Sequence, residues 1–352
     1  MVCDSNEAGG ESSMLTSLRE AMFYKNLDPQ TVQCLLCPRR CVIANGERGF
    51  CRNRENQKGK LYTIVYGRPA VVDIGPIEKA PLYHFLPGHF RLCLTCASCN
   101  LRCRHCQNWH LSQKSVEELS PFYYSPEEIL LQAKQRNLFS ISFTYTEPTV
   151  YYEYLYDISS LAKGSGMKTS IVSNGYINPE PLLKLLKVLD AVKIDLKGFS
   201  EEFYKEICSA TLRPVLESLI SVKKENVWLE IVNLVIPTLN DDLKMIDEMC
   251  RWIRGNLGLD IPLHFTRFFP DYQLTHLSPT PISTLESAYQ IAKNNGLRYV
   301  YVGNVPGHVY NSTYCPVCNR KVIHRTHFDI VEMNIAEGKC KFCHSPLQGR
   351  WK

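Results

Sequence analysis

Short apolar runs alternate with amphipathic stretches through the middle of the chain. The apolar runs are rich in β-branched and aromatic residues and are too short for helices, so they predict buried strands. These runs lie at 90–94, 139–145, 168–172, 191–195, 227–234, 263–268 and 299–302. Stretches with helical character lie between them, at 149–163, 179–189, 200–221, 241–254 and 282–294, with a break expected near Ser209. A further helix is predicted to begin at Ser125, because this N-cap serine precedes a proline and two acidic residues.

Strands that alternate with helices predict an α/β fold with a parallel sheet buried on both faces. Six or seven such units favour a full or partial barrel. An open, doubly wound sheet has the same periodicity and stays as the alternative at this point. The pattern divides the chain into an N-terminal extension at 1–88, a barrel at 89–306 and a tail at 307–352.

The composition is that of a folded protein with no strong preference for a charged partner. Hydrophobic residues make up 45% and charged residues 21% of the 352 residues, which argues against a largely disordered chain. The net charge of +5 is too small to favour nucleic acid as a partner. We find no apolar stretch of about 18 residues that would predict a membrane span. The first twenty residues also lack the apolar core of a secretory signal, so we expect a cytoplasmic protein with reduced thiols.

The 16 cysteines change this picture, because most of them form tight clusters. Such spacing predicts metal centres rather than disulfides. The clusters are Cys34, Cys37, Cys41 and Cys51; Cys93, Cys96, Cys99, Cys103 and Cys106; and Cys315, Cys318, Cys340 and Cys343. Three further cysteines, Cys3, Cys208 and Cys250, stand alone, and we assign them no role.

The central cluster allows two sets of iron ligands. Cys93, Cys96, Cys99 and Cys103 have the spacing of a bacterial ferredoxin, but the proline that normally follows is replaced by Arg104. The set Cys99, Cys103 and Cys106 has the spacing CxxxCxxC and leaves one iron of a 4Fe–4S cluster without a protein ligand. We favour this triplet, because it follows the first predicted strand, where barrel active sites lie. A zinc site completed by His105 or His110 is the structural alternative.

The two outer clusters predict further metal sites. Cys315, Cys318, Cys340 and Cys343 form two CxxC pairs with the spacing of a zinc ribbon, and zinc would stabilise a tail too short for its own core. Cys34, Cys37, Cys41 and Cys51 fit either structural zinc or an auxiliary iron–sulfur cluster. Nearby arginines, from Arg39 to Arg54, predict a solvated basic face.

The CxxxCxxC triplet after the first strand of a βα array resembles the radical SAM superfamily. Further stretches resemble glycyl-radical activating enzymes such as that of pyruvate formate-lyase, at 143–148, 173–175, 193–198, 235–241 and 262–265. The strongest resemblance is to the radical SAM member of the AmmeMemoRadiSam group, and it extends over residues 20 to 350. Its motifs lie at 34–41, 46–51, 76–79, 81–88, 106–109 and 301–307. This chain departs from the group at Cys93 and Cys96, where small residues are usual.

The resemblance implies a partial (βα)6-type radical SAM barrel, with a cysteine-rich segment before it and a zinc-ribbon-like tail after it. It also implies an oxidoreductase in which a 4Fe–4S cluster reductively cleaves S-adenosylmethionine, and the resulting radical abstracts hydrogen from a substrate. The substrate class stays open between a protein glycyl residue, a peptide and a small molecule. The implied partners are a reductant such as ferredoxin or flavodoxin and the other two AmmeMemoRadiSam proteins.

The resemblance also implies roles for individual residues at predicted strand ends. Cys99, Cys103 and Cys106 become the cluster ligands, and Glu147 the partner of the methionyl ammonium. The other implied cofactor-binding residues are Ser173, Asn174, Asp195, Lys197 and His264. Each has a structural alternative, namely a helix-terminal acid, a capping turn, a buried ion pair or a core histidine. For the whole protein, the alternatives are an iron–sulfur electron carrier without S-adenosylmethionine chemistry and a zinc-ribbon module that binds nucleic acid.

Overall fold

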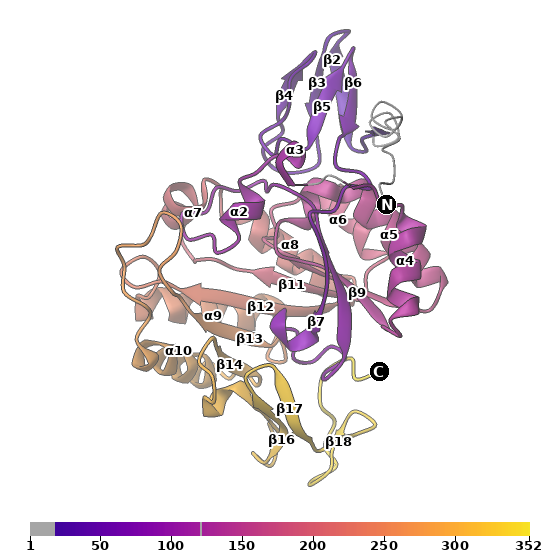
Figure 1. Ribbon diagram of the computed structural model, residues 1–352. Coiled ribbons are helices and arrows are strands. Elements are labelled where there is room, and N and C mark those ends of the chain that lie inside the picture. Colours follow the sequence, from indigo (N-terminus) through magenta and orange to yellow (C-terminus); the bar gives the residue numbers. More distant parts are fainter. Residues whose placement is uncertain (1–17, 120–121) are drawn as a thin grey trace, which may run out of the picture.

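The computed structural model describes residues 18–119 and 122–352, so Cys3 lies outside the described residues. An eight-stranded sheet forms the centre of the molecule (Figure 1). Seven of its strands are parallel and match the seven predicted runs. They are β8 (Phe90–Thr95), β9 (Ser140–Phe143), β10 (Lys168–Ser173), β11 (Ala191–Asp195), β12 (Trp228–Val235), β13 (Leu263–Arg267) and β14 (Val300–Gly303). Strand β9 ends two residues earlier than predicted, and Tyr145 just beyond it has a left-handed backbone (φ 69°).

The strand order separates the two topologies that periodicity left open. Strands β8 to β14 lie side by side in sequence order, whereas a doubly wound sheet reverses direction at a switch point. The two edges of the sheet are β14 and the unpredicted strand β7 (Val71–Pro76), which pairs antiparallel with β8. The protein therefore has an α/β fold with a singly wound, open sheet, as expected for a partial barrel.

Helices follow the strands, and right-handed connections place them on one face of the sheet. They are α4 (Pro126–Gln135), α5 (Tyr152–Gly164), α6 (Pro179–Leu186), α7 (Glu201–Cys208), α8 (Arg213–Lys224), α9 (Leu243–Leu257) and α10 (Ile282–Asn294). Short helical turns are α2 (Trp109–Ser112), α3 (Val116–Leu119), η1 (Ile77–Lys79), η2 (Pro148–Tyr151) and η3 (Val309–Asn311). The predicted break is confirmed, because α7 ends at Ser209 with a left-handed backbone (φ 53°).

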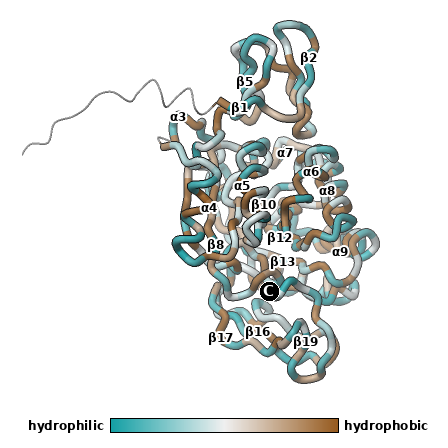
Figure 2. The backbone as a smooth tube through the Cα atoms, turned by 90° about the vertical axis from the view of Figure 1, so that its right-hand side faces the viewer, coloured by the Kyte–Doolittle hydropathy of each residue, from teal (hydrophilic) through white to brown (hydrophobic). Residues whose placement is uncertain are grey.

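The helices bury one apolar stripe each against the sheet. In α9 the buried positions include Ile246, Met249, Cys250 and Ile253, which recur at helical spacing. Burying each large aliphatic side chain contributes about 1.5 to 3 kcal/mol. Cys250 is thus a core residue, as a lone cysteine usually is. Figure 2 shows hydrophilic segments on the outer loops and helix surfaces.

Two small cysteine-rich modules flank the sheet at opposite ends of the molecule (Figures 1 and 2). The N-terminal module, residues 19–63, consists of two three-stranded antiparallel sheets. Its strands are β1 (Arg19–Glu20), β2 (Tyr24–Asp28), β3 (Thr31–Cys34), β4 (Val42–Ala44), β5 (Arg54–Gln57) and β6 (Lys60–Thr63). The C-terminal module, residues 309–352, contains β15 (Thr313–Tyr314), β16 (Lys321–Thr326), β17 (Asp329–Met333), β18 (Ile335–Ala336) and β19 (Lys339–Cys340).

The C-terminal module is fixed to the barrel by its last residues. The backbone N–H of Arg350 donates to the His84 carbonyl at 2.7 Å, and that of Leu86 donates to the Arg350 carbonyl at 2.8 Å. Buried Arg325 also bonds to the Tyr83 carbonyl at 2.8 Å. Among the described residues, no helix is both long enough and apolar enough to span a bilayer.

Candidate functional site

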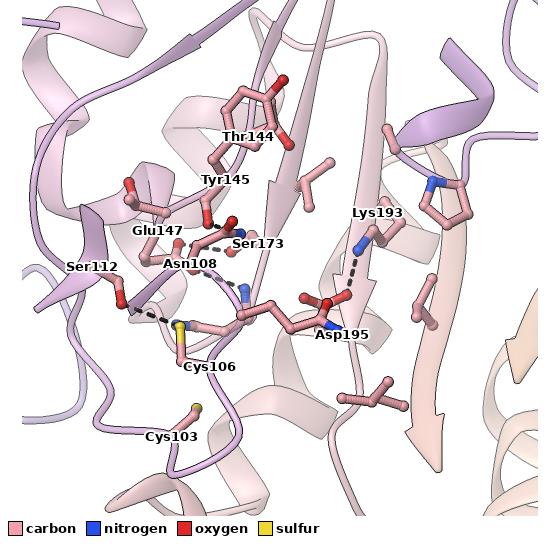
Figure 3. A pocket seen from close by; sticks show the side chains of 18 of the residues that line it. Cys103, Cys106, Asn108, Ser112, Thr144, Tyr145, Glu147, Ser173, Lys193 and Asp195 are labelled. Carbon is pink, nitrogen blue, oxygen red and sulfur yellow. Dashed lines mark hydrogen bonds and ion pairs between the residues drawn. The ribbon is translucent and has the colours of Figure 1, made fainter. Parts of the chain in front are cut away.

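A cavity of about 400 Å³ opens at the carboxyl ends of the parallel strands. In an α/β sheet this edge is where ligands and catalytic groups collect, because the loops after each strand converge there. Eight of the residues given a cluster or cofactor role from the sequence line it. They are Cys99, Cys103, Cys106, Glu147, Ser173, Asn174, Asp195 and Lys197. Figure 3 shows Cys103 and Cys106 with Glu147, Ser173 and Asp195 around the same space.

The three cysteines lie on the loop that joins β8 to α2. The loop leaves the strand through Ser98, whose backbone is left-handed (φ 75°). Its shape is held by the backbone N–H of Leu101, which bonds the Cys99 sulfur at 3.4 Å, and by Ser112 Oγ, 3.2 Å from the Cys106 sulfur. The Asn108 side chain bonds the Tyr145 carbonyl at 2.8 Å and connects this loop to the end of β9. The sequence therefore places three thiols on one wall of the cavity.

Burial keeps these thiols protonated in the metal-free chain. Burial and then the nearby Glu147 carboxylate raise the pKa of Cys99 well above its usual range. A hydrogen bond with the Cys208 thiol, followed by burial, does the same to the pKa of Cys103. Burial also raises the pKa of Cys106. Metal binding must therefore displace protons here, which couples metal affinity to pH.

Cys93 and Cys96 do not line this cavity. Cys93 is buried in β8, where its sulfur lies 3.9 Å from the Arg91 carbonyl. The Cys96 sulfur lies 3.7 Å from the Val65 carbonyl, and burial raises the pKa of this thiol. This placement supports the triplet over the ferredoxin set. His105 lines the cavity, but within the described residues it forms no group with these cysteines close enough for a single metal ion.

Glu147 is a buried carboxylate on the same cavity. It follows β9 and caps η2, and the residue is only 2% exposed, so it is no solvated helix-terminal acid. Its Oε1 accepts from the Thr149 backbone at 3.0 Å, the Thr149 hydroxyl at 2.7 Å and the Ser173 hydroxyl at 2.8 Å. Its Oε2 accepts from the Asn174 backbone at 2.8 Å. Burial raises the pKa of Glu147 even though these bonds favour the anion.

Asn174 connects the carboxylate to the thiol loop. Its backbone bonds Glu147, and its amide Nδ2 donates to Asn100 Oδ1 at 2.9 Å and approaches the Cys99 sulfur at 3.7 Å. Ser173 Oγ also accepts from the Gly175 N–H at 3.0 Å, so it serves the turn and the site together. The capping turn and the cavity role expected for these residues are therefore compatible.

Asp195 bridges two lysines at the end of β11. Its carboxylate pairs with Lys193 and, at 3.4 Å, with Lys197. Burial alone would raise the pKa of Asp195, but the two ammonium groups outweigh it and lower this pKa to about 2. The set carries a net positive charge and lines the cavity, where Figure 3 shows Lys193 paired with Asp195.

His264 lies away from the cavity lining. Its ring is buried and stacked on Tyr301 at 4.8 Å, and its Nε2 bonds the Glu230 carboxylate at 2.8 Å. Glu230 also accepts from the backbones of Tyr83 and His84 at 3.0 and 2.8 Å. Burial lowers the pKa of His264, so a neutral imidazole donates to an ionised carboxylate. The structure thus places His264 as a core histidine.

Lys193 and Cys208 are cavity-related residues that sequence reasoning missed. Lys193 lies two positions before Asp195 on the same strand, so the same period-two argument would have placed it on the same face. Cys208 had no local signal, because its proximity to Cys103 depends on how α7 packs against the thiol loop. Lys79, Arg91 and Phe328 also line the cavity, from η1, β8 and the turn between β16 and β17.

The tail cysteines form a compact group. The sulfurs of Cys315, Cys318, Cys340 and Cys343 all lie within 4.8 Å of one another. Two of the separations are 3.6 Å, from Cys315 to Cys343, and 3.8 Å, from Cys318 to Cys340. Zn–S bonds of about 2.3 Å in a tetrahedron place the sulfurs about 3.8 Å apart. The group therefore fits one tetrahedral metal ion.

Comparisons with known proteins indicate the family to which the chain is similar. The family model of the radical SAM superfamily matches residues 94–253. An uncharacterized protein of Methanocaldococcus jannaschii is 48% identical over 93% of this chain and 98% of its own length. The pyruvate formate-lyase-activating enzyme of Clostridium pasteurianum is 29% identical over 45% of this chain and 66% of its length. A solved radical SAM methyltransferase from Sphaerobacter thermophilus has 11% identity and a TM-score of 0.49, over 83% of this chain and 80% of that chain. None of these matches supports the electron-carrier or nucleic-acid alternatives.

Proposed function

The chain belongs to the radical SAM superfamily of enzymes, and from that premise we propose that it reductively cleaves S-adenosylmethionine at a 4Fe–4S cluster. The observation that carries this proposal is the cavity in which an open set of three thiols faces a buried carboxylate. Together, the cluster and S-adenosylmethionine supply one-electron cleavage of a sulfonium–carbon bond and the hydrogen abstraction that follows.

The thiol loop fits the cluster. Cys99, Cys103 and Cys106 all line the cavity, and no other cysteine lines it among the described residues. Among the described residues, the sulfurs of these three cysteines do not all lie within 4.8 Å of one another. They are therefore farther apart than the ligands of a single metal ion. Three thiolates would hold three irons and leave the fourth iron open toward the cavity.

The opposite wall fits the amino-acid part of S-adenosylmethionine. Oε2 of Glu147 accepts only one of the four hydrogen bonds, so a lone pair is free for an ammonium group. Among the described residues, no lysine or arginine forms an ion pair with this carboxylate. A buried anion needs a charge partner, and we propose that the methionyl ammonium provides it. Ser173 and Asn174 hold Glu147 in position.

The Lys193–Asp195–Lys197 set provides the complementary charge. Its two ammonium groups and one carboxylate favour an anion with neighbouring hydroxyl groups. We propose that Asp195 and Lys197 bind the ribose and carboxylate of S-adenosylmethionine. His264 is left out of the cofactor site, because its partners are Glu230 and Tyr301.

We propose that Lys79, Arg91 and Phe328, which also line the cavity, form its substrate side. Lys79 and Arg91 lie before the thiol loop, and Phe328 comes from the C-terminal module. We propose that a protein glycyl residue, a peptide or a small molecule enters here.

Ferredoxin or flavodoxin would supply the electron, and the other AmmeMemoRadiSam proteins would be functional partners. Zinc would occupy the tail cysteines. The division at 1–88, 89–306 and 307–352 stays a proposal, with β7 contributed by the first part.

The test is S-adenosylmethionine cleavage by anaerobically reconstituted protein reduced with dithionite. We expect 5′-deoxyadenosine and methionine from the wild type, and none from Cys106→Ala. The matched control is Cys93→Ala, a buried thiol of the same segment, which should keep most of the activity. If Cys93→Ala destroys the cluster while Cys106→Ala preserves it, the ferredoxin set holds the iron and the proposal fails.

A further inference from the structure

The N-terminal module gathers four cysteines around one small cavity of about 20 Å³. Cys34 ends β3, and its N–H bonds the Cys41 carbonyl at 2.9 Å, so these two residues lie side by side. Cys37 lies in the turn between them, and Cys51 lies in the loop before β5. The remaining walls are largely apolar, with Leu36, Ile43 and Val150. Such walls offer little to a water molecule, which needs two to four polar partners.

The spacing of these thiols distinguishes them from the tail group. In the tail, all four sulfurs lie within 4.8 Å of one another, as a single tetrahedral ion requires. In the N-terminal module, which is fully described from Leu18 onward, no three sulfurs are that close. The sulfurs instead surround a hollow, as do the three thiols proposed to bind the 4Fe–4S cluster. A cluster with several irons spreads its thiolates over its corners, whereas one ion draws them together.

Hydrogen-bond donors beside the hollow point toward two of its four sulfurs. Arg54 is 1% exposed and pairs with the buried Glu153 carboxylate, while its Nη1 lies 3.6 Å from the Cys34 sulfur. Arg39 also lines the hollow, with its guanidinium bonded to the Asn100 carbonyl at 2.6 Å, and the N–H of Phe50 points at the Cys41 sulfur at 3.5 Å. The arginines expected to form a solvated face therefore include one, Arg54, that is buried and contacts a thiol. Hydrogen bonds and charges near the sulfurs are what tune such clusters.

We propose that Cys34, Cys37, Cys41 and Cys51 hold a second cluster of the 4Fe–4S type, which passes single electrons to the centre at Cys99. Four thiolates leave no iron open, so electron transfer is the chemistry left to this centre. The second half of the proposal rests on the proposed function. An electron leaves a reduced donor protein of the ferredoxin or flavodoxin class, resides on the second cluster and moves to the Cys99 centre, with no bond made or broken.

Consecutive residues of the chain line the two cavities. Cys99 lines the large cavity, and the next residue, Asn100, lines the N-terminal hollow. Asn174 contacts both, because its Nδ2 donates to Asn100 Oδ1 at 2.9 Å and approaches the Cys99 sulfur at 3.7 Å. Thr149, which bonds Glu147, lines the hollow as well. The two metal centres would therefore be direct neighbours.

The first experiment counts iron, sulfide and zinc in the reconstituted full-length protein. We expect about eight irons and about eight sulfides per chain in the wild type and about half of each in C37A/C41A. The triple variant C99A/C103A/C106A should also keep about half, with the electron paramagnetic resonance signal of a reduced cluster. This triple variant tests the second cluster even if C37A/C41A does not fold. C93A/C96A, with two buried thiols that line neither site, should keep all the iron. About four irons and about two zinc ions in the wild type would overturn the proposal.

The second experiment compares reductants on C37A/C41A. With reduced flavodoxin, we expect reduction of the Cys99 cluster and S-adenosylmethionine cleavage to slow by at least about ten-fold, and with dithionite by less than about two-fold. An equal loss with both reductants, at normal iron content of the Cys99 centre, would overturn the relay. A wild type that holds both clusters but cleaves no S-adenosylmethionine would refute the proposed function and leave the second cluster established.

Discussion

Glu147 combines full burial with four hydrogen bonds and no cationic partner in the described chain. Glu147→Gln keeps the size of the side chain and much of its bonding but removes its charge. Loss of one charge-assisted hydrogen bond costs about 1.5 to 3 kcal/mol, so we expect S-adenosylmethionine affinity to fall roughly ten- to a hundred-fold. Calorimetric titration measures the affinity, and iron content should not change. Wild-type affinity together with a lowered melting temperature would show that Glu147 is only structural.

His84 makes the stability of the fold depend on pH. Its Nδ1 donates to the Gln348 carbonyl at 2.6 Å, and its Nε2 accepts from the Tyr301 hydroxyl at 2.5 Å. This arrangement requires the neutral ring, and burial lowers the pKa of His84 to about 4. The unfolded chain binds a proton near pH 6.5, so the stabilisation is complete above that pH and is lost as pH falls toward 4.

We expect this loss to be on the order of 3 kcal/mol at pH 4. His84→Asn retains an N–H donor but cannot titrate, so its free energy of unfolding should fall less between pH 6.5 and pH 4. Denaturant titrations of both proteins across that range give the difference. Parallel pH profiles would mean that other groups carry the acid sensitivity.

Residues close in sequence were predictable, and residues joined through the fold were not. The spacing of Cys99, Cys103 and Cys106 is visible in a segment of eight residues, and their cavity follows from the strand before them. The partner of His264, by contrast, is Glu230 on the neighbouring strand, 34 residues away. No local pattern indicates such a pair, which is why the sequence left His264 between core and cofactor roles.

Elements with strong end signals were predicted best. For α4, the Ser125 hydroxyl accepts from the Glu128 N–H at 3.2 Å, and the Glu128 carboxylate accepts from the Ser125 N–H at 2.6 Å. This reciprocal cap confirms the start that the sequence predicts. Strand β7 was missed, because it is an edge strand of mixed exposure that ends in proline and is followed only by the short turn η1.

The N-cap of α4 makes a measurable contribution to the free energy of unfolding. Ser125→Ala removes the acceptor for the Glu128 N–H and should lower the free energy of unfolding by about 1 kcal/mol. Ser221→Ala is the matched control, because that hydroxyl donates to the Glu217 carbonyl four residues earlier inside α8. Removing such a bond from a helix interior should be neutral or slightly stabilising. Equal destabilisation by both changes, measured by denaturant unfolding, would contradict the assigned cap.

The C-terminal module carries both a candidate metal site and a residue of the large cavity. Its four thiols fit one tetrahedral ion, and its hairpin places Phe328 on the cavity wall. Cys318→Ser with Cys343→Ser should release about one zinc ion per chain and leave the iron content unchanged. Metal analysis by mass spectrometry measures both, with Cys250→Ala as a control that affects neither. Zinc content equal to that of the wild type would refute the site.

For the whole molecule, the sequence predicted an α/β fold but did not separate a partial barrel from an open, doubly wound sheet. Both follow from alternating strands and helices. The choice between them depends on strand order, which is a property of pairing between distant segments. The positions of the two modules at opposite ends of the sheet likewise had no signal in the sequence (Figure 1). Their cysteine spacing predicted metals, but only the three-dimensional separation of the sulfurs distinguishes one ion from a cluster.

The bonds between His84 and the last residues of the chain also bear on how the protein is made. The ribosome synthesises His84 264 residues before its partner Gln348. At about 5 to 20 residues per second, this interval lasts roughly 13 to 53 seconds. During that time the nascent chain exposes the imidazole and the backbone carbonyl of His84, which later bond to Gln348 and Arg350. The surroundings of the His84 ring are therefore completed only after Gln348 has been made, so a product truncated before Gln348 would leave this seam open to proteases and chaperones.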